Sequence, residues 1–258
     1  MTTEVKEITK EPARQGGVQS IGRAFLLLET IADNAGVMGL SQLASASGLP
    51  LPTIHRLVRT LVDLGYLRQD AARQYVLAPR LIRLGESSSR LLSVWARPHL
   101  ARLVEELGES ANVAMLDGNS IVYVAQVPSQ RSMRMFTEVG RRVLPHCTAV
   151  GKAILAQQPP ETVRQLLADT GMPSFTHKTI TDPDDFLTAL EWCAERGYAI
   201  DEEEQEIGVR CVAVAVPDVS GHLALSLSGP AGRMSEQMVR RAVPLLQRSA
   251  LELSRDLS

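Results

Sequence analysis

The chain of 258 residues lacks long hydrophobic runs. Its longest apolar segments, such as Cys211 to Val216, are far shorter than the roughly 18 residues that a membrane-spanning helix needs. The first 17 residues are polar and mixed in charge, without the apolar stretch or the small-residue cleavage site of a secretory signal. We therefore expect a cytoplasmic protein with no membrane partner.

Cysteine is also scarce, since the chain holds only Cys147, Cys193 and Cys211. Their odd number and wide spacing argue against a disulfide framework, and no Cys/His pair has the interval of a structural zinc site. No metal ion or other cofactor is expected. In contrast, 45% hydrophobic and 22% charged residues are enough for a normal core, in one large domain or two smaller ones.

Positive charge is concentrated near the N-terminus although the whole chain carries a formal charge of -2. Residues 1–90 hold 11 Lys and Arg against 8 Asp and Glu, so their net charge is +3 and that of the remainder is -5. Six arginines lie between Pro50 and Arg83. Such a cluster is often only a solvated surface, so its meaning depends on the elements that carry it.

Residues 18–79 have the element order of a winged helix-turn-helix, following a flexible tail over residues 1–17. Ser20 is a suitable N-cap for a first helix with apolar residues at three- and four-residue steps, and Gly48 is suited to the tight turn after the second helix. The expected elements are a first helix ending before Asn34, a second at Ser41–Ser47, a third at Pro52–Leu64, and a hairpin of residues 66–68 and 74–77.

The third helix is suited to reading DNA. One face carries Ile54, Val58 and Leu61 for the core, and the other carries cationic and hydroxyl side chains that can donate to guanine acceptors or contact phosphates. Free amides at the start of the first helix are suited to a phosphate. The alternative is a three-helix fragment with an ordinary arginine-rich surface. The residues expected to contact double-stranded DNA are Gln19, Ser20, Pro52, Thr53, His55, Arg56, Arg59, Thr60, Arg68 and Arg73.

A helical stretch from Pro79 to about Leu107 follows, and the serine cluster at residues 87–89 together with Pro98 predicts a linker helix over residues 80–98 and then a second helix. Its apolar residues could pack between subunits or within one chain. The expectation of a homo-oligomer, dimer or tetramer, rests instead on the two half-sites that operators usually contain. These apolar residues are Leu81, Leu84, Leu91, Leu92 and Trp95.

Residues 99–258 have the pattern of an antiparallel α+β domain. The expected strands are Val113–Leu116, Ile121–Gln126, Met133–Phe136, Gly197–Asp201, Arg210–Val216 and His222–Ser228, with helices near Val150–Ala156, Glu161–Thr170 and Asp184–Arg196.

Alternation along the last two strands separates a core face from a second face of small residues. Val212, Val214 and Val216 point one way, and Cys211, Ala213 and Ala215 point the other. In the next strand, three leucines alternate with Ala224, Ser226 and Ser228. The small, weakly polar face could be the floor of a small-ligand site or could let helices approach closely.

A helix start and an acidic run add to this picture. Thr148 is expected to cap a helix whose first amides, those of Ala149 and Val150, favour an anion such as a carboxylate. In the run Asp201 to Glu204, we expect a mostly solvated loop in which Asp201 ends a strand and points inward.

The chain resembles the bacterial IclR-type transcriptional regulators from about Val18 to Ser235. The similarity is carried by Leu49 to Tyr66, Gly151 to Ala156 and Asp201 to Ala213. It implies an N-terminal winged helix-turn-helix, a C-terminal GAF-like domain that binds an effector, dimers or tetramers, and control of an operon. By position, the effector contacts implied are Met133, Met135, Val143, Ala149, Val150, Asp201, Cys211, Ser226 and Ser228.

Within that family, residues 48–59 and 208–212 look most like actinomycete repressors of allantoin utilisation, which implies a small carboxylate or ureide as effector. The leading hypothesis is a repressor that such a ligand releases from DNA. The alternatives are an activator of an aromatic or acid catabolic operon, and a cysteine-dependent enzyme in which Cys147 or Cys211 acts as nucleophile near His146. The enzyme is disfavoured because no second base is placed for it.

Overall fold

The computed structural model describes residues 18–135, 137–219 and 222–257, which form two compact units divided between Ser88 and Ser89. The predicted tail, residues 1–17, lies outside the described residues. Each unit has a hydrophobic core of its own. Among the described helices, none has the length and hydropathy required to cross a membrane.

The first unit is a winged helix-turn-helix, as predicted. Three helices pack on a small antiparallel sheet of order β1-β3-β2, and Gly48 closes α2 in the left-handed region at φ 64°. Two details differ from prediction. Val18, not Ser20, occupies the N-cap of the first helix. The strand β1 was not predicted, because two residues are too few to show an alternation of apolar and polar side chains. The elements are α1 (Gln19–Asp33), β1 (Val37–Met38), α2 (Leu40–Ser47), α3 (Leu51–Asp63), β2 (Leu67–Gln69) and β3 (Tyr75–Leu77).

The linker prediction was wrong in one respect. A single helix, α4 (Arg80–Leu107), replaces the two expected helices and contains Pro98 in its interior. Proline removes one backbone donor from a helix, but Ala96, Leu100 and Leu103 on either side are at most 2% exposed in the core of the second unit. Their burial favours continuation of the helix through the proline. The side chains of Leu91 and Leu92 are outside the described part of the chain, and Trp95 is half exposed.

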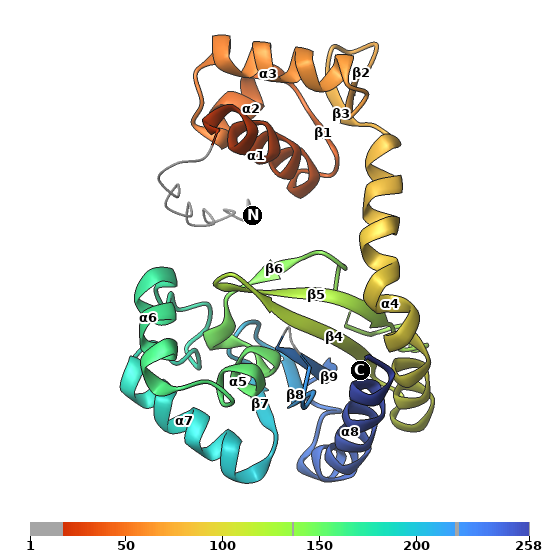
Figure 1. Ribbon diagram of the computed structural model, residues 1–258, viewed down its shortest axis with the longest axis vertical. Helices are drawn as coiled ribbons and strands as arrows, with labels where there is room; N and C mark the ends of the chain where they lie inside the picture. The colour runs from red at the N-terminus through yellow and green to blue at the C-terminus, as the bar shows by residue number, and fades with distance from the viewer. Residues whose placement is uncertain (1–17, 136, 220–221, 258) are drawn as a thin grey trace. The chain divides into compact units, whose positions relative to one another are not determined.

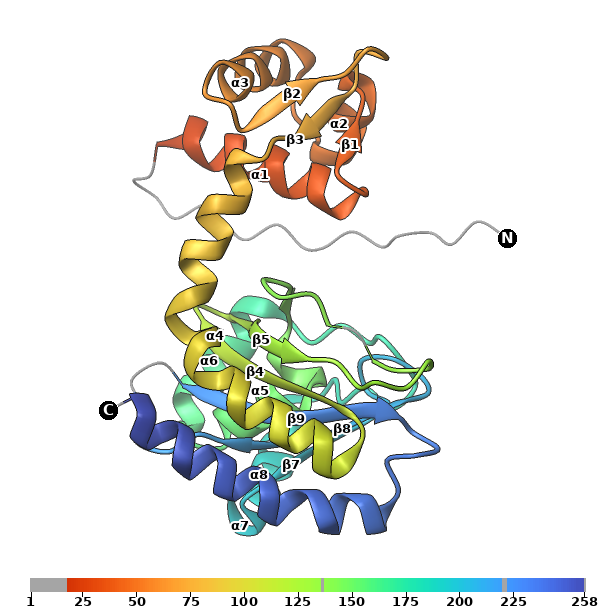
Figure 2. The same cartoon turned by 90° about the vertical axis from the view of Figure 1, so that its right-hand side faces the viewer.

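The second unit is built on a six-stranded antiparallel sheet of order β6-β5-β4-β9-β8-β7 (Figures 1 and 2). The C-terminal half of α4 and the last helix, α8, cover one face, and α5 packs on the other. The elements are β4 (Ser110–Asp117), β5 (Ser120–Val127), β6 (Arg142–Val143), the short 3-10 helix η1 (Pro145–Cys147), α5 (Ala149–Leu155), α6 (Pro160–Thr170), α7 (Pro183–Arg196), β7 (Ala199–Glu202), β8 (Val209–Ala215), β9 (Leu223–Pro230) and α8 (Glu236–Leu257).

The two faces of the sheet divide as alternation predicted. Val212, Val214 and Val216 join the core under α4 and α8, whereas Ala213 and Ala224 pack against α5 on the opposite face. One predicted strand is wrong, because residues 133–135 are irregular; its fourth residue, Phe136, lies outside the described residues. The short β6 and the long α8 were not predicted.

Candidate functional site

The outer face of α3 presents the side chains that the sequence singled out. Ile54, Val58 and Leu61 are buried in the core, as their spacing requires. Of the ten predicted DNA contacts, Thr53 is half-buried, and the others are exposed: Gln19, Ser20, Pro52, His55, Arg56, Arg59, Thr60, Arg68 and Arg73. The residues of α3 share one helix face, whereas Gln19 and Ser20 lie on α1 and the last two arginines on the β2–β3 hairpin.

Arg56 and Arg59 are available to an outside partner. Neither side chain makes a hydrogen bond or ion pair within the described part of the chain. Thr60 differs, since its hydroxyl donates to the carbonyl oxygen of Arg56 at 3.0 Å. Arg80 is also engaged: it donates to the carbonyl oxygen of Leu64 at 2.6 Å and lies over the ring of Tyr66. The arginine charge of α3 that has no partner among the described residues is therefore carried by Arg56 and Arg59.

A cavity of about 70 Å³ lies in the second unit, on the small-residue face of the sheet. We call it the sheet cavity. Its walls come from strands β5 to β9, the start of α5, the segment before β6 and the turn between β7 and β8. The lining residues are Tyr123, Met135, Thr137, Arg141, Val143, Thr148, Ala149, Val150, Asp201, Gln205, Glu206, Val209, Cys211, Ser226 and Ser228.

The structure brings eight of the nine residues proposed as effector contacts together around this cavity. Met133 is the exception: its side chain is 71% exposed and does not line the cavity. Tyr123 and Arg141 were missed. The alternation of β5 could have indicated Tyr123, which shares a sheet face with the buried Ile121. Arg141 stands just before β6, a two-residue strand without a sequence signal.

Three of the lining side chains form a row across the sheet. Asp201 on β7 is directly opposite Cys211 on β8, which is in turn opposite Ser228 on β9. Side chains directly opposite one another in antiparallel strands lie on the same face of the sheet. Asn112 on β4 extends the polar group, because its amide donates to the hydroxyl of Ser228 at 3.2 Å.

The start of α5 is held against the cavity by a cap and a glycine. As predicted, Thr148 caps the helix, and its hydroxyl accepts from the amide of Gly151 at 3.1 Å. A Cβ atom on Gly151 would lie 2.1 Å from the carbonyl oxygen of Pro145, which is too close for any other residue. Glycine therefore allows η1 and α5 to pack tightly, and Ala149 and Val150 at the start of α5 line the cavity.

Burial favours the neutral form of three side chains that line the cavity. It raises the pKa of Asp201 to about 7, partly offset by the amide of Glu204, which donates to Oδ1 at 2.8 Å. Burial also raises the pKa of the Cys211 thiol and of the Tyr123 phenol. Near pH 7, Asp201 can therefore either accept or donate a proton.

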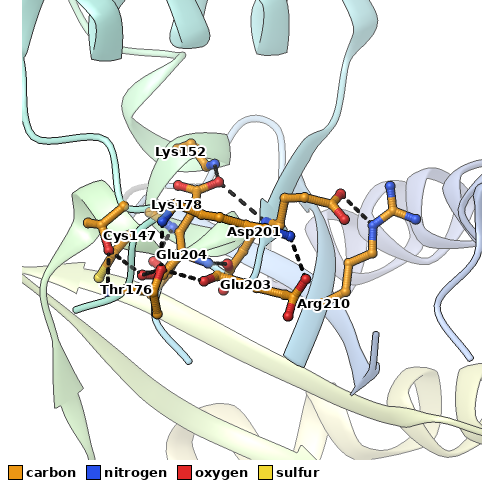
Figure 3. Close-up of polar contacts among 12 residues, drawn as sticks. Cys147, Lys152, Thr176, Lys178, Asp201, Glu203, Glu204 and Arg210 are labelled. Atoms are coloured by element: carbon orange, nitrogen blue, oxygen red, sulfur yellow. Dashed lines mark hydrogen bonds and ion pairs between the residues drawn. The ribbon is translucent and has the colours of Figure 1, made fainter. Parts of the chain in front are cut away.

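The acidic run Asp201 to Glu204 is more buried than expected. Glu204 is only 5% exposed and forms an ion pair with the equally buried Lys152 of α5 (Figure 3). Hydroxyls of the segment before α7 bind its backbone, since Thr179 Oγ1 donates to the Glu204 carbonyl oxygen at 2.6 Å. Only Glu202 and Glu203 contact solvent more freely. The pair thus fixes the turn that presents Asp201 to the cavity.

The raised pKa of Asp201 gives a pH dependence. Between about pH 4 and pH 7 the folded state binds a proton at Asp201 that the unfolded chain has released, so the free energy of unfolding falls as pH rises through this window. In Asp201→Asn this contribution is absent. The difference in melting temperature between variant and parent should therefore grow from pH 4 to pH 7 in favour of the variant, as measured by calorimetry. A difference independent of pH would contradict the assignment.

No three His, Cys, Asp or Glu side chains among the described residues are grouped closely enough to hold a metal ion.

Comparisons with known proteins agree with both units. Residues 20–71 match the IclR helix-turn-helix domain, and residues 87–255 match the C-terminal domain of the bacterial transcriptional regulator IclR. The transcriptional repressor IclR of Escherichia coli is 34% identical over 246 residues, covering 93% of this chain and 90% of that protein. The repressor AllR of Salmonella typhimurium is 31% identical over 250 residues, covering 95% and 92%.

A solved structure extends the similarity to three dimensions. The crystal structure of the Thermotoga maritima IclR matches with a TM-score of 0.72 and 29% identity, covering 92% of this chain and 98% of that one. A helix-turn-helix with exposed arginines and a cavity lined by polar side chains thus occur in a chain that is similar to these regulators over nearly its whole length. The chain belongs to the IclR family of bacterial transcriptional regulators.

Proposed function

We propose that the protein is a repressor that binds operator DNA through α3 and dissociates from it when a small carboxylate or ureide binds in the sheet cavity. The observation that carries the proposal is the cavity itself. It is enclosed by buried polar side chains, with Asp201, Ser226 and Ser228 each at most 5% exposed. These side chains accept hydrogen bonds from Asn112 and from the amide of Glu204, and a ligand with oxygen or nitrogen atoms can bond to them in addition.

The volume restricts the ligand. About 70 Å³ holds only a few water molecules, so a compact acid or amide fits better than a fused ring system. Arg141 lines the same space, and its side chain makes no hydrogen bond or ion pair within the described residues, so its positive charge can meet a carboxylate. Similarity to AllR, a repressor by name, supports repression. The allantoin pathway as the source of the effector rests on the resemblance of residues 48–59 and 208–212 noted in the sequence.

Release from DNA requires the ligand to bind the DNA-competent and the released states with different affinity. A coupling of about 1–3 kcal/mol is typical and changes DNA affinity by roughly 5- to 150-fold. A homodimer or homotetramer would present two α3 helices to the two halves of an operator. The enzyme considered from the sequence is excluded by family membership, since IclR-type proteins are regulators and not enzymes.

The test is fluorescence anisotropy with the DNA upstream of the protein's own gene, at two salt concentrations. We expect tight binding that weakens with salt, as contacts to phosphates require, and release by one of glyoxylate, allantoin and allantoate. Acetate and urea serve as controls for unspecific effects of an acid or an amide. If the protein bound DNA tightly and none of the three compounds affected binding, the assignment of DNA binding would stand. The proposal that the effector comes from the allantoin pathway would be wrong.

A further inference from the structure

The second unit contains another cavity, which is lined by α5, α7, α8 and the end of β8. Its volume is about 350 Å³, within the range of roughly 300–1,000 Å³ that small-molecule sites occupy. We call it the helix cleft and define it by Ala153 of α5, Cys193 of α7, Val214 of β8 and Leu251 of α8. None of the described residues lines both this cleft and the sheet cavity. The helix cleft is therefore a separate space, and it is large enough for a ring that the sheet cavity excludes.

The walls of the helix cleft are mostly apolar. Ala153, Val214 and Leu251 line it from three different elements. Leu251 is 52% exposed, although its neighbour Ala250 is buried in the core of the unit. A half-exposed leucine beside a cavity loses contact with water when an apolar ligand binds there, and this favours binding.

The polar part of the lining carries no charge. No Asp, Glu, Lys, Arg or His of the described residues lines the helix cleft, whereas Asp201 and Arg141 line the sheet cavity. Burial raises the pKa of the Cys193 thiol, which is therefore neutral near pH 7. An ion that entered the cleft would lose water without gaining a countercharge, so a neutral ligand is favoured. The polar lining side chains are Gln157, Cys193, Tyr198 and Gln247.

Gln247 has a side-chain amide that a ligand can use. Its nitrogen donates to the carbonyl oxygen of Gly197 at 3.4 Å, which is long for a hydrogen bond. Gly197 has a φ of 72°, and a Cβ atom there would lie 3.2 Å from the same nitrogen. Glycine thus leaves space for the amide of Gln247 beside the cleft. A ligand oxygen at a shorter distance can accept this hydrogen bond in place of Gly197.

We propose that the helix cleft is a second ligand site, and that it binds a neutral, mostly apolar molecule of the size of one aromatic ring with an amide or hydroxyl group. The ring contacts Ala153, Val214 and Leu251, and the polar group bonds to Gln247. The chemistry of this ligand differs from that of the effector proposed above, because the sheet cavity is smaller and is lined by charged side chains.

Two helices connect the helix cleft with the rest of the protein. In α5, Ala153 lines the cleft, and Ala149, about one turn before it, lines the sheet cavity. In α8, Leu251 precedes Glu252, which pairs with Arg102 of α4. The helix α4 begins in the first unit, since the two units divide between Ser88 and Ser89. We therefore expect a ligand in the cleft to change the affinity for DNA, an effect that rests on the function proposed above.

Benzamide and benzamidine are matched probes of the helix cleft, because they have nearly the same shape and benzamidine is positively charged at neutral pH. Calorimetric titration of the full chain measures both affinities in the parent, in Gln247→Glu and in the control Gln237→Glu. Gln237 is exposed on the same helix and does not line the cleft. The parent should bind benzamide about tenfold or more tightly than benzamidine, a difference of roughly 1.4 kcal/mol. Gln247→Glu should reverse this preference, and Gln237→Glu should retain it.

Cysteine labelling then locates the probe. Benzamide should slow the reaction of Cys193 with N-ethylmaleimide, measured by mass spectrometry, and should leave the reaction of Cys211 in the sheet cavity unchanged. Protection of Cys211 instead of Cys193 would overturn the site. So would a preference for benzamide that Gln247→Glu did not alter. Benzamide binding that disappeared as the protein was concentrated would show that a second copy of the chain covers the cleft, which would also contradict the proposal.

The effect on DNA is measured by fluorescence anisotropy with saturating benzamide. We expect the affinity for operator DNA to change about fivefold or more in the parent, and to change little in Gln247→Glu. If benzamide bound in the helix cleft and left DNA affinity unchanged, the site would stand and its coupling to DNA would be wrong. Binding to DNA without benzamide tests the function proposed above independently, so the failure of one proposal is distinguishable from the failure of the other.

Discussion

Lys152→Met is expected to lower the free energy of unfolding of the second unit by about 3–5 kcal/mol. The Lys152 and Glu204 side chains are 5% and 7% exposed, and one carboxylate oxygen of Glu204 has no hydrogen-bond partner in the structure. Methionine preserves the length of the side chain but leaves the carboxylate of Glu204 buried without a countercharge. Urea unfolding followed by circular dichroism measures the loss.

Two further variants separate burial from charge. In the double variant Lys152→Met with Glu204→Gln, no buried charge remains, so much of the lost stability should return. Lys178 pairs with Glu203 on the same turn, but it is more exposed, and Lys178→Met should change stability little. If Lys152→Met were as stable as the parent, the pair would not hold the turn, and Asp201 would owe its position to the strand pairing alone.

Much of the fold follows from local patterns in the sequence. The 3.6-residue periodicity of α3 and the alternation of β8 and β9 each indicate one buried face, and the structure confirms these faces. In α1 the periodicity was only partly right, because Leu28 and Ile31 are buried but Ile21 and Phe25 are more than half exposed. The errors occur where contacts between residues distant in the sequence decide the local structure. Pro98 is a local helix breaker that neighbouring buried residues overrule, and the strand predicted at Met133 has no partner in the sheet.

The site was predictable where the alternation of side chains along a strand determines which residues share a face of the sheet. Alternation along β8 and β9 places Cys211, Ser226 and Ser228 on one face, and these residues do line the sheet cavity. The pairing of Lys152 with Glu204 joins residues 52 positions apart and carries no local signal. The same holds for the row from Asp201 to Ser228, which depends on the register of three strands.

Arg56→Ala is expected to weaken operator binding about tenfold to hundredfold for each half-site, without lowering the melting temperature. A bidentate arginine contact to a guanine contributes roughly 1–3 kcal/mol of discrimination. The side chain of Arg56 is exposed and makes no hydrogen bond or ion pair with any residue that the structure describes, so its loss removes nothing from the fold. Fluorescence anisotropy on operator and on unrelated DNA measures the effect.

The pattern of loss distinguishes a base contact from a phosphate contact. If Arg56 reads a base, operator binding falls while binding to unrelated DNA changes little; if it contacts a phosphate, both fall and the salt slope decreases by about one. Arg164→Ala is the matched control, because it also removes one positive charge, from an exposed pair with Asp184 in the second unit. An Arg56→Ala protein that bound its operator like the parent would show that α3 does not enter the groove, and the exposed arginines of this helix would then be only a solvated surface.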